Sequence, residues 1–140
     1  MTEALMDMLV SEMLIVLKVV AVVLEEADCS PDIHSLIPIY GVPTRCLYVG
    51  TTQAAALKLL GPITGLTPDV ILTDPALLQD VVAEVANILA GNLWPLLDGA
   101  TGIGLPSGGD PPRPLGEPMP RVYAIDGVPA LVVLIGSSTL

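Results

Sequence analysis

The chain has 140 residues, which is enough for one domain with one sizeable core. Its hydrophobic content of 52% argues against a disordered chain. With 5 basic against 15 acidic residues and a formal net charge of −10, it has too few cations to neutralise a row of nucleic-acid phosphates, and the same excess of acid disfavours an anionic membrane surface.

The best candidate for a membrane segment is the apolar run from Met13 to Leu24, which is too short to span a bilayer and holds Lys18 in its middle. The residues before it are acidic, unlike the basic start of a secretory signal peptide. We therefore expect a soluble, cytoplasmic protein. The cysteines, Cys29 and Cys46, match neither a metal-binding spacing nor a disulfide framework and are expected to be free thiols.

The N-terminal half of the chain predicts a helix, two strands and a second helix. The first helix is expected from a cap at Thr2 to about Glu26, because apolar residues recur there at helical spacing. Residues 35–41 and 44–50 are short β-like runs and are expected to form an antiparallel pair. A short helix should follow, capped by Thr51 or Thr52 and ending near Gly61.

The second half starts with the clearest helix signal in the chain. Thr73 or Asp74 is expected to cap this helix, Pro75 lies in its first turn, and an apolar-periodic run continues to about Gly91. A strand is expected within residues 100–108, followed by a loop rich in proline and glycine over residues 108–120. The last two strands should flank the tight-turn dipeptide at residues 126–127. This order predicts an α+β fold, with residues 1–140 forming a single domain around a largely antiparallel sheet.

The C-terminal run from Ala130 to Gly136 is apolar on both of its alternating faces. A bare edge strand of this kind would promote aggregation. It should therefore lie in the centre of the sheet or pair with a second copy of the chain.

The helix expected over residues 75–91 has two unlike sides when it is plotted at about 100° per residue. One broad side is apolar and must be buried, and it consists of Leu78, Val81, Val82, Val85, Ile88 and Leu89. The opposite side holds Asp80, Glu84, Asn87 and Gly91 within about 60° of one another. Ala83 and Ala90 flank this narrow polar side, so a partner could approach it closely. An ordinary solvent-facing side would also place an acid and an amide three residues apart.

Other catalytic chemistry has little support in the sequence. His34 is the only histidine, so no Ser–His–Asp set is indicated, and a satisfied histidine in a loop or on the surface is the favoured interpretation. No His/Cys cluster predicts a metal site. The glycines of residues 99–104 lack the lysine and the following helix of a phosphate-binding loop.

The segment DVVAEVANILAGN, residues 80–92, resembles the signature helix of the CheC/CheX family of chemotaxis phosphatases, in which a Glu-x-x-Asn pair is followed by small residues and a glycine. The layout of the remaining elements is similar to that of the family. A single signature helix is typical of the CheX type. The resemblance implies a homodimer with the CheX-like fold.

This resemblance also implies a function. Members of the family hydrolyse the aspartyl phosphate of a CheY-like response regulator, which supplies the carboxylates, the Mg²⁺ and the lysine, so this chain would need no cofactor of its own. Asn87 would hold the attacking water, and Glu84 would pair with the lysine of the regulator. Asp80, Ala83, Ala90 and Gly91 would form the surface on which the phosphorylated receiver domain docks. The alternatives are a catalytically silent dimeric interaction module and a flagellar-switch relative that binds the regulator without hydrolysing it.

Overall fold

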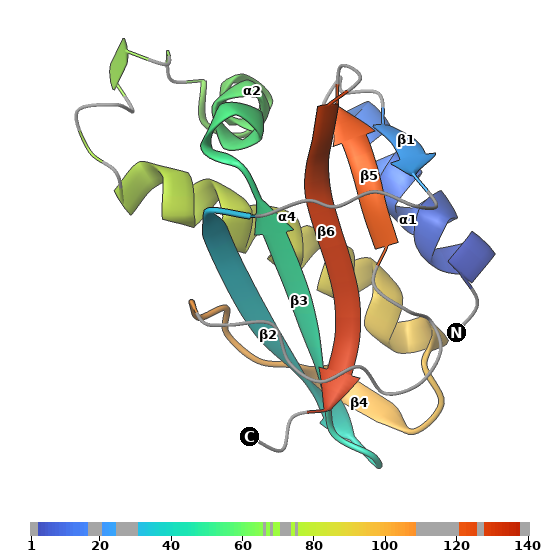
Figure 1. Cartoon of the computed structure of the whole chain (residues 1–140). Coiled ribbons are helices and arrows are strands. Elements are labelled where there is room, and N and C mark those ends of the chain that lie inside the picture. The colour runs from blue at the N-terminus through green and yellow to red at the C-terminus, as the bar shows by residue number, and fades with distance from the viewer. Residues whose placement is uncertain are drawn as a thin grey trace.

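The protein is described by a computed structural model over residues 3–16, 21–24, 31–65, 67, 69–70, 74, 76–108, 121–125 and 128–137. Its elements, in chain order, are α1 (Glu3–Val16), β1 (Ala21–Leu24), β2 (Ile33–Gly41), β3 (Arg45–Thr51), α2 (Gln53–Thr64), α4 (Ala76–Leu93), a 3₁₀ helix η1 (Trp94–Leu96), β4 (Ala100–Ile103), β5 (Arg121–Ile125) and β6 (Val128–Ser137). The strands form one sheet in the order β1-β5-β6-β3-β2-β4, and every neighbouring pair is antiparallel (Figure 1). The predicted α+β fold is confirmed.

One face of the sheet is covered by α1 and α4, which lie behind the strands in Figure 1. Side chains alternate along a strand, so every second residue of the central strands points to these helices. These residues form the core together with the inward side of α4, and on the strands they are Ile37, Ile39, Leu47, Val49, Leu131, Val133 and Ile135. The core therefore lies between α4 and the sheet.

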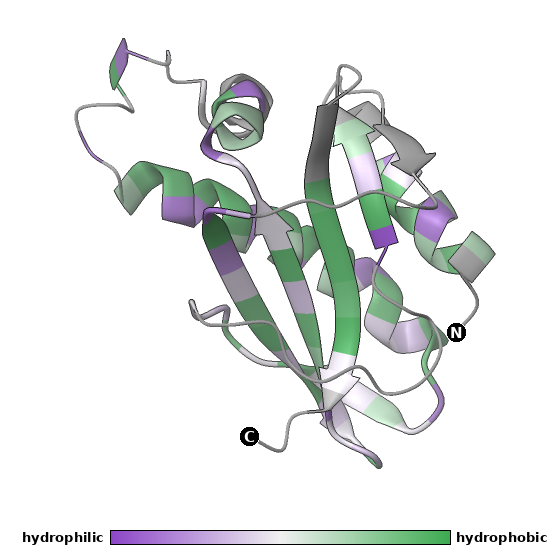
Figure 2. Cartoon of the chain, in the orientation of Figure 1, coloured by the Kyte–Doolittle hydropathy of each residue, from purple (hydrophilic) through white to green (hydrophobic). Residues whose placement is uncertain are grey.

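The strand β6 occupies the centre of the sheet, between β5 and β3. Figure 2 shows its hydrophobic residues along most of its length. Both of its faces are shielded, since Leu131, Val133 and Leu134 are all buried. The first of the two predicted placements is confirmed, and the apolar character of β6 is satisfied within one chain.

The first helix is shorter than the sequence predicts. It ends at Val16 and not near Glu26, and residues 21–24 form β1, which pairs with β5. The segment that was expected to be helical contains a run of valines, whose β-branched side chains fit a strand better than a helix. Residues 21–24 form a strand and not a helix because they pair with β5 in antiparallel orientation.

A polar cluster fastens α1 to the sheet. Arg121 on β5 donates to both carboxylate oxygens of Asp7, through Nε at 3.0 Å and Nη2 at 2.6 Å, and the Tyr123 hydroxyl donates to Asp7 Oδ1 at 2.8 Å. Burial alone would raise the pKa of Asp7, but the hydrogen bonds from Arg121 and Tyr123 and the charge of Arg121 outweigh it and lower that pKa. Burial, and next the Asp7 carboxylate, raise the pKa of Tyr123. Asp7 is therefore a charged structural group.

The predicted strand pair and the second helix are present with small changes at their ends. β2 and β3 form an antiparallel hairpin in which Ile37 lies opposite Leu47. Thr52 caps α2, since its Oγ1 accepts a hydrogen bond from the backbone nitrogen of Ala55 at 3.2 Å. The helix continues past Gly61 to Thr64, where Gly65, at φ +72°, ends it in the left-handed conformation that glycine adopts easily.

Candidate functional site

The helix α4 is capped by Asp74, one of the two candidates that the sequence offers. The Oδ1 of Asp74 accepts a hydrogen bond from the backbone nitrogen of Ala76 at 3.1 Å, and its carbonyl oxygen accepts one from Leu77, also at 3.1 Å. Thr73, the other candidate cap, and Pro75 lie outside the described residues. The cap fixes where the helix starts. The apolar period of its residues decides which of them face the sheet.

The inward side of α4 is the predicted one. Five of its residues are each at most 6% exposed, namely Leu78, Val81, Val82, Val85 and Leu89. Ile88 is half-buried and packs against the margin of the core. Residues 76–96 are also the one described segment long and apolar enough to cross a membrane, but the burial of this side identifies α4 as the core helix of the domain.

The opposite side of α4 is exposed at all four predicted polar positions, Asp80, Glu84, Asn87 and Gly91. Ala83 beside them is half-buried. Within the part of the chain that the structure describes, the side chains of Glu84 and Asn87 make no hydrogen bond or ion pair. A carboxylate and an amide three residues apart therefore lie on one helix face, and neither makes a hydrogen bond to the described part of the chain.

No part of the chain that the structure describes crowds Gly91. It lies inside α4, it is exposed, and a Cβ atom added to it would meet no atom within 4 Å. Glycine inside a helix costs about 1 kcal/mol relative to alanine. Gly91 therefore lowers the stability of the helix without relieving any crowding. Because it has no side chain, it leaves the helix backbone uncovered beside Asn87. Another molecule can approach this backbone closely.

Ala90 does not belong to this exposed surface. It was predicted to flank the polar side, but its exposed fraction is 0% and it is part of the core. On the helix it is displaced from Asn87 by about 60° toward the side on which Ala86 is also buried. The helix α2 packs against α4 as well. The side chain of Ala90 therefore supports the helix and cannot contact a partner directly.

The remaining chemistry of the described residues is structural. His34 lies on β2 and not in a loop. It is half-buried, and its Nδ1 is satisfied by the Tyr48 hydroxyl at 2.6 Å. Cys46 is a free, half-buried thiol whose pKa is raised by burial, while Cys29 lies outside the described residues. Among the residues with described positions, no three His, Cys, Asp or Glu side chains gather in a metal-binding group.

The described side chains of this face can orient a water molecule and bind a cation. An amide such as that of Asn87 both donates and accepts hydrogen bonds, so it can hold a water molecule without adding charge. The Glu84 carboxylate can bind a cation. The described part of the chain offers no nucleophile–base pair near them.

Comparison with known proteins identifies the fold. No protein-family model matches the sequence, and no curated protein matches it. Among solved structures, the chain is similar to the chemotaxis protein CheX from Vibrio vulnificus, with a TM-score of 0.70, 13% identity and 93% of each chain covered. It is also similar to the CheX–CheY–BeF3–Mg²⁺ complex from Borrelia burgdorferi, with a TM-score of 0.62, 16% identity and coverage of 94% of this chain and 91% of the other.

A third similar structure is the FliM middle domain from H. pylori, with a TM-score of 0.51, 13% identity and coverage of 96% of this chain and 86% of the other. The architecture is therefore one used by proteins of bacterial chemotaxis. More particularly, the chain has the fold of the CheX and CheC-like chemotaxis proteins.

Proposed function

We propose that this chain is a CheX-like phosphatase that acts on the aspartyl phosphate of a CheY-like response regulator. The observation that carries the proposal is the exposure of Glu84 and Asn87 on one face of α4, within the CheX fold. The similarity to a CheX–CheY complex supports a receiver domain as the partner. Asp80, Ala83 and Gly91 would border the contact.

In the proposed mechanism the regulator supplies the reacting groups, including its own Mg²⁺. The Asn87 amide holds a water molecule in line with phosphorus. The water oxygen forms a bond to phosphorus while the bond to the aspartyl oxygen breaks, and the products are inorganic phosphate and the free aspartate. Glu84 pairs with the lysine of the regulator and fixes the register of the helix. Phosphoryl transfer depends mostly on positioning, so two side chains are sufficient for this role.

The decisive test is Asn87→Ala, assayed by release of phosphate from a phosphorylated receiver domain. We expect activity to fall by about 100-fold or more, as for other positioned groups, with the fold intact because the residue is exposed. Asn92 offers a matched control, since it is an exposed asparagine of the same helix that lies about 140° away from Asn87. Asn92→Ala should retain wild-type activity. Equal rates for Asn87→Ala and wild type would refute the proposed mechanism.

Glu84 acts by charge in this scheme, and salt should therefore reveal its role. Glu84→Ala should weaken binding of the regulator, since an ion pair at an interface is lost. Raising the ionic strength should reproduce this effect in the wild type and should leave the defect of Asn87→Ala unchanged. If salt has no effect on the affinity of the wild type, Glu84 does not engage the regulator by charge.

The similarity to the FliM middle domain favours one alternative, a non-catalytic interaction module of the same fold. Such a module would bind a receiver domain, or another partner, without releasing phosphate. Binding measured by calorimetry together with the phosphate assay separates the two functions, because the module gives heat of binding with no acceleration of hydrolysis.

We further propose that the protein is a homodimer in the cytoplasm, on the basis of its resemblance to the CheX type. The central position of β6 removes the earlier physical reason for expecting a dimer, since that strand is already paired on both sides. Light scattering at tens of micromolar, a working scale for such affinities, tests the assembly. A monomeric mass at that concentration would contradict it.

A further inference from the structure

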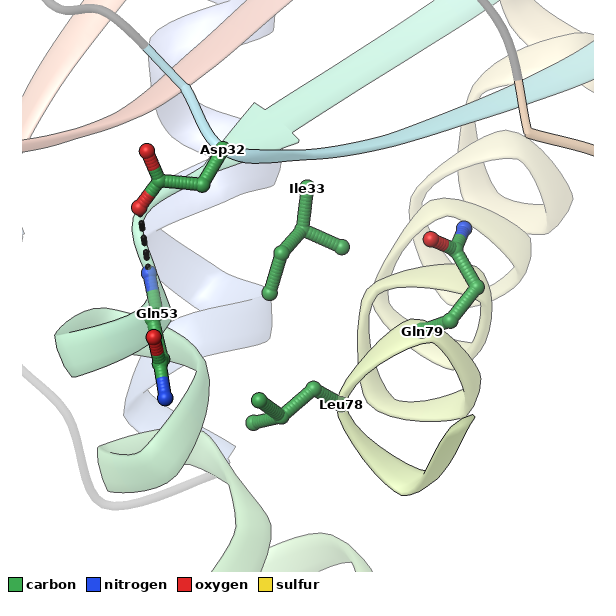
Figure 3. A pocket seen from close by; sticks show the side chains of 5 residues that line it. All are labelled: Asp32, Ile33, Gln53, Leu78 and Gln79. Carbon is green, nitrogen blue, oxygen red and sulfur yellow. Dashed lines mark hydrogen bonds between the residues drawn. The ribbon is translucent and has the colours of Figure 1, made fainter. Parts of the chain in front are cut away.

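The two ends of α4 differ in how their polar groups are satisfied. At the N-terminal end the chain supplies partners, since Asp74 caps the first turn and Gln79 Nε2 donates to the backbone carbonyl oxygen of His34 at 2.6 Å. A pocket of about 340 Å³ lies beside this end and is lined by Asp32, Ile33, Gln53, Leu78 and Gln79 (Figure 3). Its carboxylate, that of Asp32, is directed to the backbone nitrogen of Gln53 at 3.2 Å and belongs to the start of α2. This end of the helix is therefore closed by contacts within the chain.

The C-terminal end of α4 leaves a backbone carbonyl without a donor. In an α-helix each carbonyl accepts a hydrogen bond from the N–H four residues later, and for Gly91 that residue is Pro95, which has no N–H. The neighbouring donors serve other carbonyls. By the same pattern the N–H of Trp94 serves Ala90, and Leu97 donates to the carbonyl of Trp94 at 3.2 Å. From outside the helix, no group in the described part of the chain donates to the carbonyl of Gly91.

The charge and the exposure of this carbonyl favour a cation. Carbonyls without donors carry the partial negative charge at the C-terminal end of a helix, and the last turn of α4 has no basic residue. Arg45 donates to the carbonyl of Asp98 at 2.7 Å, beyond the end of the helix. Gly91 is exposed, and its missing side chain leaves open space around it. A cationic N–H donor on another molecule can therefore reach its carbonyl.

We propose that the carbonyl of Gly91 accepts a hydrogen bond from a lysine or arginine side chain of the docked receiver domain. The inference rests on the docking surface of the proposed function. Gly91 lies four residues after Asn87, or about 6 Å along the helix axis, so one interface covers both. Glu84 lies seven residues before Gly91, or about 10 Å along the axis, so one head group cannot bond to both. The receiver therefore needs a second basic side chain, in addition to the lysine that pairs with Glu84, and receivers that lack it should bind more weakly.

The variant Pro95→Ala tests the proposal because it supplies the missing N–H. Residue 95 is exposed and alanine suits a helix, so the new N–H should bond to the carbonyl of Gly91 and occupy it. Calorimetric binding of a beryllofluoride-loaded CheY-like receiver domain of the same organism should weaken about three- to tenfold at low ionic strength. The loss should shrink as salt is added, because the donor is charged. Leu96→Ala is the control, since it alters the next exposed residue but keeps Pro95, and it should leave the affinity unchanged.

The carbonyl carbon resonance of Gly91 reports on the acceptor in the wild type itself. It should shift when the receiver is added, and it should already be shifted in free Pro95→Ala. The proposal is overturned by a Gly91 resonance that does not respond to the receiver, by an unchanged affinity of Pro95→Ala, or by a loss of affinity that salt does not reduce.

These results are separable from those for the proposed function. A receiver that binds with the expected dependence on residue 95 but is not dephosphorylated refutes the phosphatase and leaves this proposal standing. Release of phosphate together with equal affinities of Pro95→Ala and wild type does the reverse. Absence of any binding overturns both.

Discussion

Replacement of Gly91 by alanine should stabilise the protein and at the same time lower its proposed phosphatase activity. The added methyl group meets no atom of the chain within 4 Å, and the residue lies in the last turns of α4. Alanine is favoured over glycine in helices by about 1 kcal/mol, and somewhat less near a helix end. We expect a gain of about 0.5–1 kcal/mol in the free energy of unfolding. For a chain of 140 residues this corresponds to a rise in Tm of about 2–4 °C.

The same methyl group should hinder the regulator. If the receiver domain packs closely over Gly91 beside Asn87, one extra carbon in that contact costs about 1–3 kcal/mol. Since 1.4 kcal/mol corresponds to a factor of ten, kcat/KM for the phosphorylated receiver should fall by about tenfold. Thermal unfolding and phosphate release, measured on one preparation, give both quantities.

Gly102 provides a matched control for this experiment. It is also a glycine whose added Cβ would meet nothing within 4 Å, but it lies on β4 and not on α4. Gly102→Ala should leave kcat/KM unchanged. A Gly91→Ala protein that is stabilised and fully active would show that no partner approaches this part of the helix closely, and the docking surface would have to be placed elsewhere.

Two further predictions concern the stability of the domain. The folded-state pKa of Asp7 is lowered, so its contribution to stability is present above its unfolded pKa of about 3.9 and is lost as the pH falls through the folded value. Asp7→Asn should therefore lower the free energy of unfolding by about 1.5–3 kcal/mol at pH 7, because hydrogen bonds to a charged group are lost. In urea unfolding at decreasing pH, the difference between Asp7→Asn and wild type should vanish in acid. The Ser35 hydroxyl is fully buried with no partner among the described residues. Ser35→Ala should therefore raise the free energy of unfolding by about 1 kcal/mol and move the urea midpoint upward. A lowered midpoint would show that the hydroxyl has a partner.

The helix α4 could be predicted from the sequence because its determinants are local. Its cap, its apolar period and its polar side all lie within about twenty residues, and the structure has Asp74 at the start with Glu84 and Asn87 exposed. The error at Ala90 is also local. Alanine suits either side of a helix, so only the packing of neighbouring elements decides whether it is buried.

The features that were missed depend on distant parts of the chain. The strand β1 forms because β5, about a hundred residues later, pairs with it. Its apolar run satisfied a helical period equally well, since a continuously apolar segment fits a buried helix and a buried strand alike. The hydrogen bond that orients the Gln79 amide has the same origin. The acceptor that fixes the Gln79 amide is the carbonyl of His34, 45 residues earlier, and no pattern of side chains signals a backbone contact of this kind.

The proposed site is nearly independent of the fold that carries it. Glu84 and Asn87 are exposed and make no bond within the described chain, so their loss would change stability by about 0.5 kcal/mol or less. A lineage can therefore lose the reaction and keep the domain, or keep both, with no change in the core. In keeping with this independence, the fold is shared by CheX and by the FliM middle domain. The unbonded amide of Asn87, the carboxylate one turn before it and the bare backbone at Gly91 are local features that favour catalysis here, because an interaction module has no need of a water-holding amide beside an uncrowded approach.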